Sequence, residues 1–221
     1  ENGMERLEEV SEQQTESLAI LHGEDIPDIM PGQTEMEEQE EEHRESVSYF
    51  ARWTDRYKEA REYLYGTMEA EPDEEAAHEI MLEEVEQGNA YAMHDMGKIY
   101  AQGIGCEADK EKADVWYQKA LAAMHYVEQK KKNTYLEYRI GKMYQYGLGT
   151  DENLEQAAEW FSKAAAKEHK YALYSLGMLY LQGKGVEQDE ETAYSLLFRS
   201  YSKGNPYAAY ELGKLYEAGC G

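Results

Sequence analysis

The residue types that most often carry metal chemistry are present in this chain, but they are not arranged for it. The 221 residues include six histidines and two cysteines. A zinc site needs ligands at short, defined spacings on one turn or one helix. No two histidines have such a spacing, and the motifs H-E-x-x-H and C-x-x-C do not occur. We therefore expect no metal site, and we interpret His94 as a surface or packing residue.

The glycine motifs also lack the context that cofactor binding or catalysis requires. G-x-G pairs occur at 103/105, 147/149 and 183/185, but none has a third glycine. They are expected to follow helices, whereas dinucleotide-binding loops follow strands. Neither G-x-S-x-G nor G-K-[ST] is present, and the many glutamates give no convergent acid–base pair. The sequence thus predicts no catalytic residue and no cofactor.

Four glycines in equivalent sequence contexts, here called the marker glycines, define a repeat. Gly141, Gly177 and Gly213 are 36 residues apart, and Gly97 precedes Gly141 by 44, which is one period plus an insertion of eight. The surrounding segments are AMHDMGKIYAQGIG, LEYRIGKMYQYGLG, ALYSLGMLYLQGKG and AAYELGKLYEAGCG. A period of this length indicates a solenoid, in which each unit buries its apolar face against its neighbours.

Each unit is predicted to be a pair of helices. Between residues 170 and 204, apolar residues recur twice at helical spacing, and Gly183 and Gly185 interrupt the pattern. A glycine inside a helix costs about 1 kcal/mol relative to alanine. Its recurrence at one repeat position therefore predicts a close approach of the second helix. Small residues such as Ala157 and Ala193 are the expected partners.

The segment KYALYSLGMLYLQGKGVEQDEETAYSLLFRSYSKGN resembles a Sel1-like repeat, a relative of the tetratricopeptide repeat. The specific signal is the pattern A-x-x-x-L-G-x-x-Y-x-x-G-x-G-V-x-x-D, whose central part, G-x-x-Y-x-x-G-x-G, recurs four times in register. The resemblance covers roughly residues 55–221. It implies an all-α fold, an α/α superhelical solenoid of helix-pair repeats, which mediates protein–protein contacts and commonly has no catalysis of its own.

This pattern divides the chain into an acidic segment, residues 1–50, and a repeat domain, residues 51–221. We expect a degenerate unit at 55–89, complete units at 90–132, 133–169 and 170–204, and a truncated unit at 205–221. In the degenerate unit Arg61 stands where the marker glycine is expected, and only the second helix, at 73–88, is predicted. The other helix pairs are predicted at 90–131, 134–168 and 170–203, with a lone helix at 206–218.

The charge is strongly acidic and unevenly distributed. The net charge is −24, and residues 1–50 contain 16 acids against two bases. We interpret this segment as a solvated linker or tail, with an ordered helix built on Leu7, Val10, Leu18 and Leu21 as the alternative. Direct binding of nucleic acid is disfavoured, because it needs clustered bases. The run 130–132 is lysine only, and we interpret it as the end of an elongated second helix or as a local docking patch.

The ends of the chain and its cysteines bear on its cellular context. There is no signal peptide and no apolar run near 18 residues, so no contact with a membrane is expected. Cys106 and Cys220 lie three repeats apart and should be free thiols, which favours the cytoplasm. The chain lacks an initiating Met and ends inside an interhelical loop. We expect a piece of a larger bacterial protein, with a bare last repeat that can self-associate edge to edge.

Tyrosines recur in register along the first helices. Those three residues after the marker glycines are expected in the core. A second ladder lies six residues before each marker glycine, and it shares a helical stripe with the residues at −2 and +1. These positions form the candidate partner groove: Tyr91, Asp95, Lys98, Tyr135, Arg139, Lys142, Tyr171, Ser175, Met178, Tyr207, Glu211 and Lys214. First helices of such solenoids line a concave groove, and aromatic side chains with a polar tip are typical anchors for a protein or peptide. The alternative is that these tyrosines only seal the seam between repeats.

Three functions are compatible with this pattern. The first is a non-catalytic protein-binding scaffold. The second is an accessory domain of a DNA-processing enzyme, because SLLFRSYSKGNPYAAYELGKLY is similar to repeat tails of plasmid mobilisation relaxases. The nuclease motifs of that class, a catalytic tyrosine region and a three-histidine metal site, are absent here and would have to precede Glu1. The third is a structural spacer, which binds no partner through the tyrosine stripe.

Overall fold

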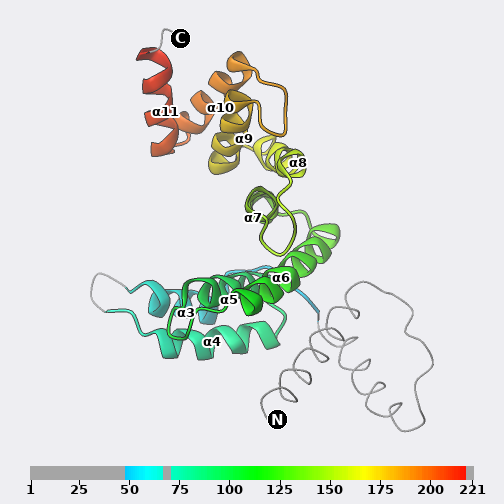
Figure 1. Cartoon of the computed structure of the whole chain (residues 1–221), viewed down its shortest axis with the longest axis vertical. Helices are drawn as coiled ribbons and strands as arrows, with labels where there is room; N and C mark the ends of the chain where they lie inside the picture. The colour runs from blue at the N-terminus through cyan, green and yellow to red at the C-terminus, as the bar shows by residue number, and fades with distance from the viewer. Residues whose placement is uncertain (1–47, 67–70, 218–221) are drawn as a thin grey trace, which may run out of the picture. The chain divides into compact units, whose positions relative to one another are not determined.

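The structure is a computed structural model, and it describes residues 48–66 and 71–217. The chain divides into two units, residues 1–47 and 48–221, and the second contains all the described residues (Figure 1). The expected apolar stripe of the acidic segment therefore lies outside the described residues. The same is true of Cys220.

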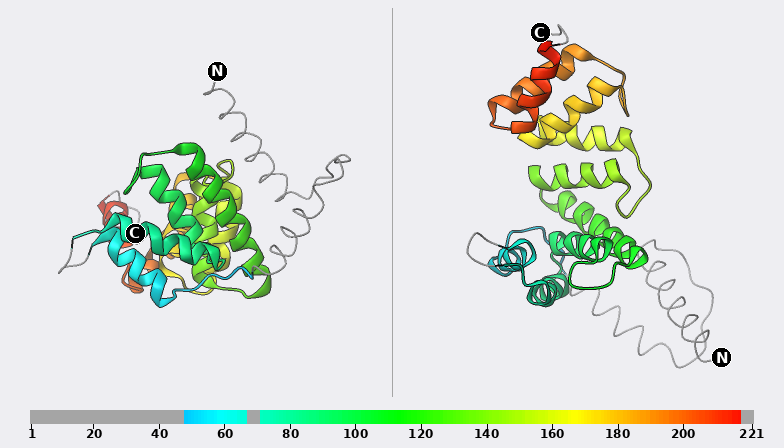
Figure 2. Two further views of the ribbon diagram at one scale, coloured as in Figure 1. Left: turned by 90° about the horizontal axis from the view of Figure 1, so that it is seen from below. Right: turned by 60° about the vertical axis from the view of Figure 1, so that its left-hand side comes forward.

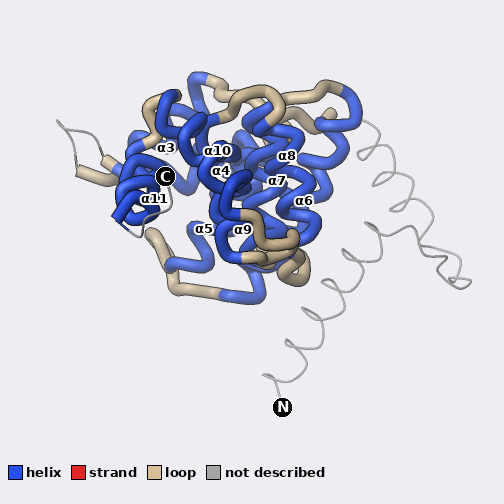
Figure 3. The backbone as a smooth tube through the Cα atoms, turned by 90° about the horizontal axis from the view of Figure 1, so that it is seen from above, coloured by secondary structure: helices blue, strands red, loops and turns tan. Residues whose placement is uncertain are grey.

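The described part of the chain is helical throughout (Figure 3). In it, the only β-type pairing is an isolated bridge between Phe50 and Asn89. This confirms the all-α expectation. The helices, in chain order, are α3 (Asp55–Tyr65), α4 (Glu74–Glu86), α5 (Ala90–Gln102), α6 (Lys110–Lys130), α7 (Thr134–Tyr146), α8 (Leu154–Ala165), α9 (Lys170–Gln182), α10 (Glu190–Ser202) and α11 (Pro206–Glu217).

Helices adjacent in the sequence pack against each other. The most extensive contacts join α3 to α4, α5 to α6, α7 to α8 and α9 to α10, and smaller contacts link each pair to the next (Figure 2). This is the predicted helix-pair solenoid. Helices α3, α5, α7, α9 and α11 are here called the first helices, and α4, α6, α8 and α10 the second helices.

The prediction of a second helix alone in the degenerate unit was wrong, because α3 is present. The side chain of Thr54 caps α3 by accepting a hydrogen bond from the backbone N–H of Tyr57. Tyr57, Ala60 and Leu64 form its buried face. Aromatic and small residues thus bury this helix although the marker pattern of the other units is missing.

The caps also correct the register of this unit. Gly97 lies eight residues after its N-cap, Asn89, and the other marker glycines keep the same distance from the residue before their helices. Eight residues after Thr54 the chain has Glu62. Arg61 is therefore one residue short of the marker position.

The eight-residue insertion lengthens one second helix. Helix α6 has 21 residues, whereas α8 has 12 and α10 has 13. It ends at Lys130, and Lys131 is its C-cap. A basic side chain in the last turn complements the negative end of the helix dipole. The interpretation of this lysine run as the end of an elongated helix is confirmed.

The second glycine of a G-x-G pair permits a close contact between units. Gly149 has a positive φ of 70°, and a Cβ there would lie 2.4 Å from the backbone N of Gln118 in α6. Only glycine allows both the left-handed conformation and this approach at low cost. The loops after α5, α7 and α9 each make such a contact, and each is therefore fixed against the preceding second helix.

The marker glycines meet larger partners than expected. A Cβ at Gly97 would lie 2.5 Å from the ring of Tyr117, and one at Gly141 would lie 2.6 Å from the ring of Phe161. The close approach is confirmed, but aromatic rings and not small residues fill the space at these two units. At Gly177 the contacts are looser, with Leu197 Cγ at 3.1 Å and the backbone oxygen of Ala193, one of the expected small partners, at 3.3 Å. At Gly213 no described atom lies within 4 Å.

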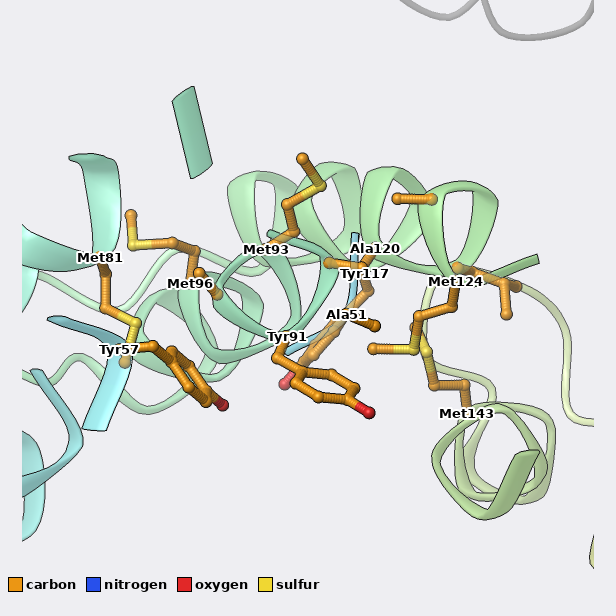
Figure 4. Packing of buried hydrophobic residues seen from close by; sticks show 14 of the residues in the cluster. Ala51, Tyr57, Met81, Tyr91, Met93, Met96, Tyr117, Ala120, Met124 and Met143 are labelled. Atoms are coloured by element: carbon orange, nitrogen blue, oxygen red, sulfur yellow. The ribbon is translucent and has the colours of Figure 1, made fainter. Parts of the chain in front are cut away.

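The core follows the helix pairs. Its largest cluster extends from Ala51 to Trp160 and is rich in methionine, with Met81, Met96 and Met124 among its fully buried members (Figure 4). Flexible, polarisable methionine side chains fill irregular gaps between helices. Smaller clusters continue through α8 to α10, and then between α10 and α11.

Candidate functional site

The twelve residues of the candidate groove lie on the first helices, but they are not equally accessible. All four residues at the −2 position are buried, with exposed fractions of 2% for Asp95, 8% for Arg139, 6% for Ser175 and 9% for Glu211. The expectation of an accessible stripe fails here. These residues lie in the seams between units, where polar side chains need partners.

The tyrosine ladder at −6 changes from buried to exposed along the chain. Tyr91 is 1% exposed and Tyr135 is half-buried, whereas Tyr171 is 36% and Tyr207 is 62% exposed. Tyr91 and Tyr135 touch edge to face, with ring centroids 5.5 Å apart. The ladder therefore seals a seam at α5 and α7, and presents aromatic surface at α9 and α11.

The residues at +1 lie toward solvent. Lys98, Lys142 and Met178 are half-buried, and Lys214 is exposed. The Nζ atom of Lys98 donates to the hydroxyl of Tyr65 at 2.8 Å. Lys214 makes an ion pair with Glu211 on its own helix at 2.7 Å.

A buried ionic cluster joins three first helices. Asp95 of α5 accepts hydrogen bonds at 2.8 Å from the Tyr57 hydroxyl and from Nη1 of Arg61, both on α3. Nη2 of Arg139 on α7 donates to its other carboxylate oxygen at 3.4 Å. His94 Nδ1 lies 3.2 Å from the same oxygen and acts as a donor, because the carboxylate can only accept. One carboxylate thus holds two arginines.

Aromatic rings enclose this cluster. The guanidinium of Arg139 lies over the rings of Tyr91 and Tyr135, at 5.4 and 5.8 Å from their centroids. Arg61 lies over Trp53 at 5.2 Å, and Trp53 is also within 6.0 Å of Tyr135. Stacking of this kind is typical of arginine in partly dry surroundings. Trp53, which lies two residues before α3, therefore contacts a first helix that is two units further along the solenoid.

Burial and charge set the protonation states in the cluster. Burial alone raises the pKa of Asp95, but the hydrogen bond from His94 and the charges of Arg139 and Arg61 together keep that pKa below its usual value. Burial, reinforced by Arg139, lowers the pKa of His94 to about 4. At neutral pH the cluster therefore contains an ionised carboxylate and a neutral imidazole.

His94 is thus a packing residue, which is one of the two roles expected for it. Its ring lies edge-on to Tyr117, with centroids 5.4 Å apart. Sequence reasoning missed Trp53, Tyr57 and Arg61, because the unit that contains them lacks the marker pattern. Their concentration of aromatic and basic residues was the available signal.

The C-terminal part of the face has a different character. Tyr138 contacts Tyr171 at 6.1 Å, and Tyr174 contacts Tyr207 at the same centroid distance. Neutral aromatic contacts thus link α7 to α9 and α9 to α11. By contrast, Asp95 and its arginines link α3, α5 and α7. In the last unit Leu212, which was expected to be bare, is buried against α10, whereas Tyr216 is 57% exposed.

The described residues contain no group of three or more His, Cys, Asp or Glu side chains placed to hold a metal ion. No helix among them has the length and apolar character to cross a membrane. Cys106 is a free cysteine in the loop after α5.

Comparison with known proteins places these features in a family. The family model described as Sel1 repeat matches residues 57–83, 90–123, 135–169, 170–205 and 206–220. A Sel1 repeat protein from Oxalobacter formigenes is similar in structure, with 29% identity, a TM-score of 0.50, and coverage of 72% of this chain and 44% of its own. A search of curated proteins gave no match.

A second solved structure is a protective antigen, c5321, of uropathogenic Escherichia coli, whose fold is called an SLR fold. It is 26% identical, with a TM-score of 0.55, and the match covers 82% of this chain and 36% of that one. This chain therefore spans less than half the length of either solved relative. The repeat matches cover more than half of the chain, and each of the first four falls on one observed helix pair. The chain belongs to the Sel1 repeat family.

Proposed function

We propose that the repeat domain, residues 51–221, is a non-catalytic scaffold that binds a partner protein through the face of its first helices. The observation that carries this proposal is the exposed aromatic surface at α9 and α11. Tyr171, Tyr207 and Tyr210 are 36%, 62% and 68% exposed. Large aromatic side chains on a surface supply contact area at low entropic cost, and they are enriched at the centres of interfaces.

The family membership supports the same function, since helix-pair solenoids offer extended surfaces for other proteins. The buried and half-buried tyrosines of the ladder, on α5 and α7, support the proposed function in another way. Because Tyr91 and the Asp95 cluster fix α3, α5 and α7 to one another, the exposed tyrosines extend from a preorganised support. Preorganisation lowers the cost of binding. The comparisons do not address the resemblance to mobilisation relaxases.

The test compares two double variants of the chain as baits for partner capture. Replacing Tyr171 and Tyr207 by alanine removes two exposed rings of the first-helix face. The matched control replaces Tyr126 on α6 and Tyr201 on α10, which are 43% and 51% exposed and belong to second helices. Quantitative mass spectrometry of captured proteins should show partners that the first variant loses and the control retains.

The Tyr91 position is unsuited to this test, because a buried ring cannot be removed without affecting the fold. Circular dichroism and thermal melting should show that both double variants remain folded. If the two variants capture the same proteins in the same amounts as the unmodified chain, the first-helix face is not the binding surface. The spacer hypothesis would then be the better one.

A further inference from the structure

Charge is divided between the two kinds of helix. The second helices carry thirteen acidic and six basic residues, a net charge of −7. The first helices carry seven acidic and eight basic residues, a net charge of +1. In a chain of net charge −24, this separation leaves the first helices as the one helix layer of the described residues that is not acidic.

The difference is sharper for the charges that reach solvent on the central first helices. On α5, α7 and α9 the only acids are Asp95 and Glu137, and they are 2% and 1% exposed. Asp95 is held by its arginines, and Glu137 by Lys167 at 2.6 Å. The solvent-reaching charges of these three helices are therefore Lys98, Lys142 and Lys170.

The lysines of this face lie over exposed tyrosine rings. Lys98 lies 4.6 Å from the centroid of Tyr65, and Lys142 lies 4.3 Å from that of Tyr146. Both lysines also donate to the hydroxyl of their tyrosine, at 2.8 and 3.0 Å. The two rings are 43% and 59% exposed. Among the described residues neither lysine has a carboxylate partner.

A lysine also lies over a tyrosine ring in the last unit, where Lys214 is 5.2 Å from the centroid of Tyr210, but this lysine is paired with Glu211. Relative to the marker glycines, Lys98, Lys142 and Lys214 occupy position +1, whereas Tyr146 is at +5, Tyr210 is at −3 and Tyr65 lies on the preceding first helix, α3. Residues three or four apart share one side of a helix, so the three lysines lie on one stripe of their first helices, together with Tyr146 and Tyr210. A fourth pair, Lys170 with Tyr171, begins α9.

We propose that this lysine–tyrosine face binds an acidic peptide, a segment of a partner protein rich in Asp and Glu with apolar or aromatic residues between them. The inference rests on the proposed function and names the chemistry of its partner. A carboxylate can accept from the lysine Nζ and the tyrosine hydroxyl of one pair, while apolar side chains pack on the exposed rings.

The spacing of the units suits an extended chain. Packed helices lie about 8–10 Å apart, and an extended peptide advances about 3.3 Å per residue. An acid at every third residue would therefore meet Lys98 and Lys142 on the neighbouring first helices α5 and α7. A long nucleic acid is disfavoured, because its binding depends on neutralising many phosphates and the second helices are acidic.

The experiment selects binders from a random library of displayed 12-residue peptides on the immobilised full chain. Fluorescence anisotropy then measures the best-enriched peptide, and the same peptide with Asn and Gln in place of its acids. We expect the selected pool to be at least twofold enriched in Asp and Glu. The amide peptide should bind at least ten times more weakly, and added salt should weaken only the acidic one.

Variants locate the site on the surface. Lys98→Glu with Lys142→Glu should weaken binding of the acidic peptide at least tenfold. The milder pair Lys98→Gln with Lys142→Gln should weaken it less, which keeps the test valid if the glutamates disturb folding. The control Lys110→Glu with Lys184→Glu changes the net charge equally at exposed sites outside the first helices, and should change the affinity less than twofold.

Three results would overturn the proposal. The selected peptides could be neutral or basic and yet fail to bind the variant that carries both Tyr171→Ala and Tyr207→Ala. That result would refute the acidic partner but leave the proposed function standing. If the chain enriches no peptide over the starting library, the result would contradict both the acidic partner and the proposed function. Tighter binding of a 12-nucleotide single-stranded oligothymidylate than of the selected peptide would identify the face as a nucleic-acid surface instead.

Discussion

Two first helices of the repeat array, α5 and α11, use equivalent positions in different ways. In α5 the −6 and −2 residues, Tyr91 and Asp95, are 1% and 2% exposed and contact neighbouring first helices. In α11 the same positions hold Tyr207, which is 62% exposed, and Glu211, whose ion pair among the described residues is with Lys214 of its own helix. The repeat fixes the location of a side chain, and the neighbouring units decide whether it serves packing or recognition.

The cause lies in what each neighbour supplies. Asp95 has an arginine from each side, Arg61 from α3 and Arg139 from α7. At α9 the equivalent residue is Ser175, which cannot form an ion pair, and the +1 residue is Met178. The seam between α7 and α9 is therefore closed by tyrosine contacts and apolar packing. Its rings remain partly accessible.

The first and largest expected contrast is between Tyr91→Ala and Tyr207→Ala. Tyr91 is fully buried, so its truncation should destabilise the protein by about 3–5 kcal/mol, as for other large buried aromatics. Truncating the exposed Tyr207 should change the free energy of unfolding by no more than about 0.5 kcal/mol. Urea unfolding followed by circular dichroism measures both. Equal losses of unfolding free energy would show that the two positions are packed alike, contrary to their difference in burial.

Asp95→Ala tests the ionic cluster. Its removal leaves Arg61 and Arg139 without their shared carboxylate, and Arg139 has only 10% of its side chain exposed. Breaking a buried ion pair in this way costs about 3–5 kcal/mol. The matched change, Glu211→Ala, removes only a contact with an exposed lysine on the same helix and should cost about 0.5 kcal/mol. A loss below about 1 kcal/mol for Asp95→Ala would mean that stacking on tyrosines alone holds the arginines.

The pH dependence of stability should reveal the same cluster. The pKa of His94 is lowered to about 4 by burial, with Arg139 adding to the effect, Asp95 opposing it and Lys98 nearby. An unfolded histidine has a pKa of about 6.5. Between these values the unfolded chain binds more protons than the folded one, so stability is fully present above pH 6.5 and is lost as the pH falls toward 4.

The size of this effect follows from the shift of about 2.5 units, which corresponds to about 3 kcal/mol at most. His125 and His169 add to the same trend, because burial lowers the pKa of both. His94→Gln should therefore flatten the stability curve between pH 6.5 and 4 without abolishing its slope. An unchanged slope would show that His94 is protonated in the folded protein without penalty.

Sequence periodicity was sufficient to predict the repeat, the helix pairs and the close approach at the marker glycines. These depend on local spacing and on a pattern that occurs four times. It was not sufficient for α3, since a helix that is buried by Tyr57, Ala60 and Leu64 needs no glycine pattern. The identity of the residues opposite the glycines was also missed, because it depends on rotamers and on the angle between helices.

The candidate groove was predicted as a single stripe, and the structure separates it into buried and exposed members. The reason is that sequence reasoning predicts a polar residue to be exposed unless a buried partner for it is known. Asp95 and Arg139 are 44 residues apart, and Asp95 and Arg61 are 34 apart. No local pattern connects them. The pairing of Lys98 with Tyr65, across two units, was hidden for the same reason.

The smallest expected contrast is at the marker glycines themselves. Alanine at either position should gain about 1 kcal/mol of helix propensity. At Gly141 the added Cβ would meet the Phe161 ring at 2.6 Å, and overpacking of this kind costs about 1–3 kcal/mol. Gly141→Ala should thus be neutral to about 2 kcal/mol less stable. At Gly213 no described atom opposes the Cβ, so Gly213→Ala should be stabilising by up to about 1 kcal/mol. Thermal melting of the two variants decides the matter, because propensity alone would raise both midpoints equally and only packing against a second helix can separate them.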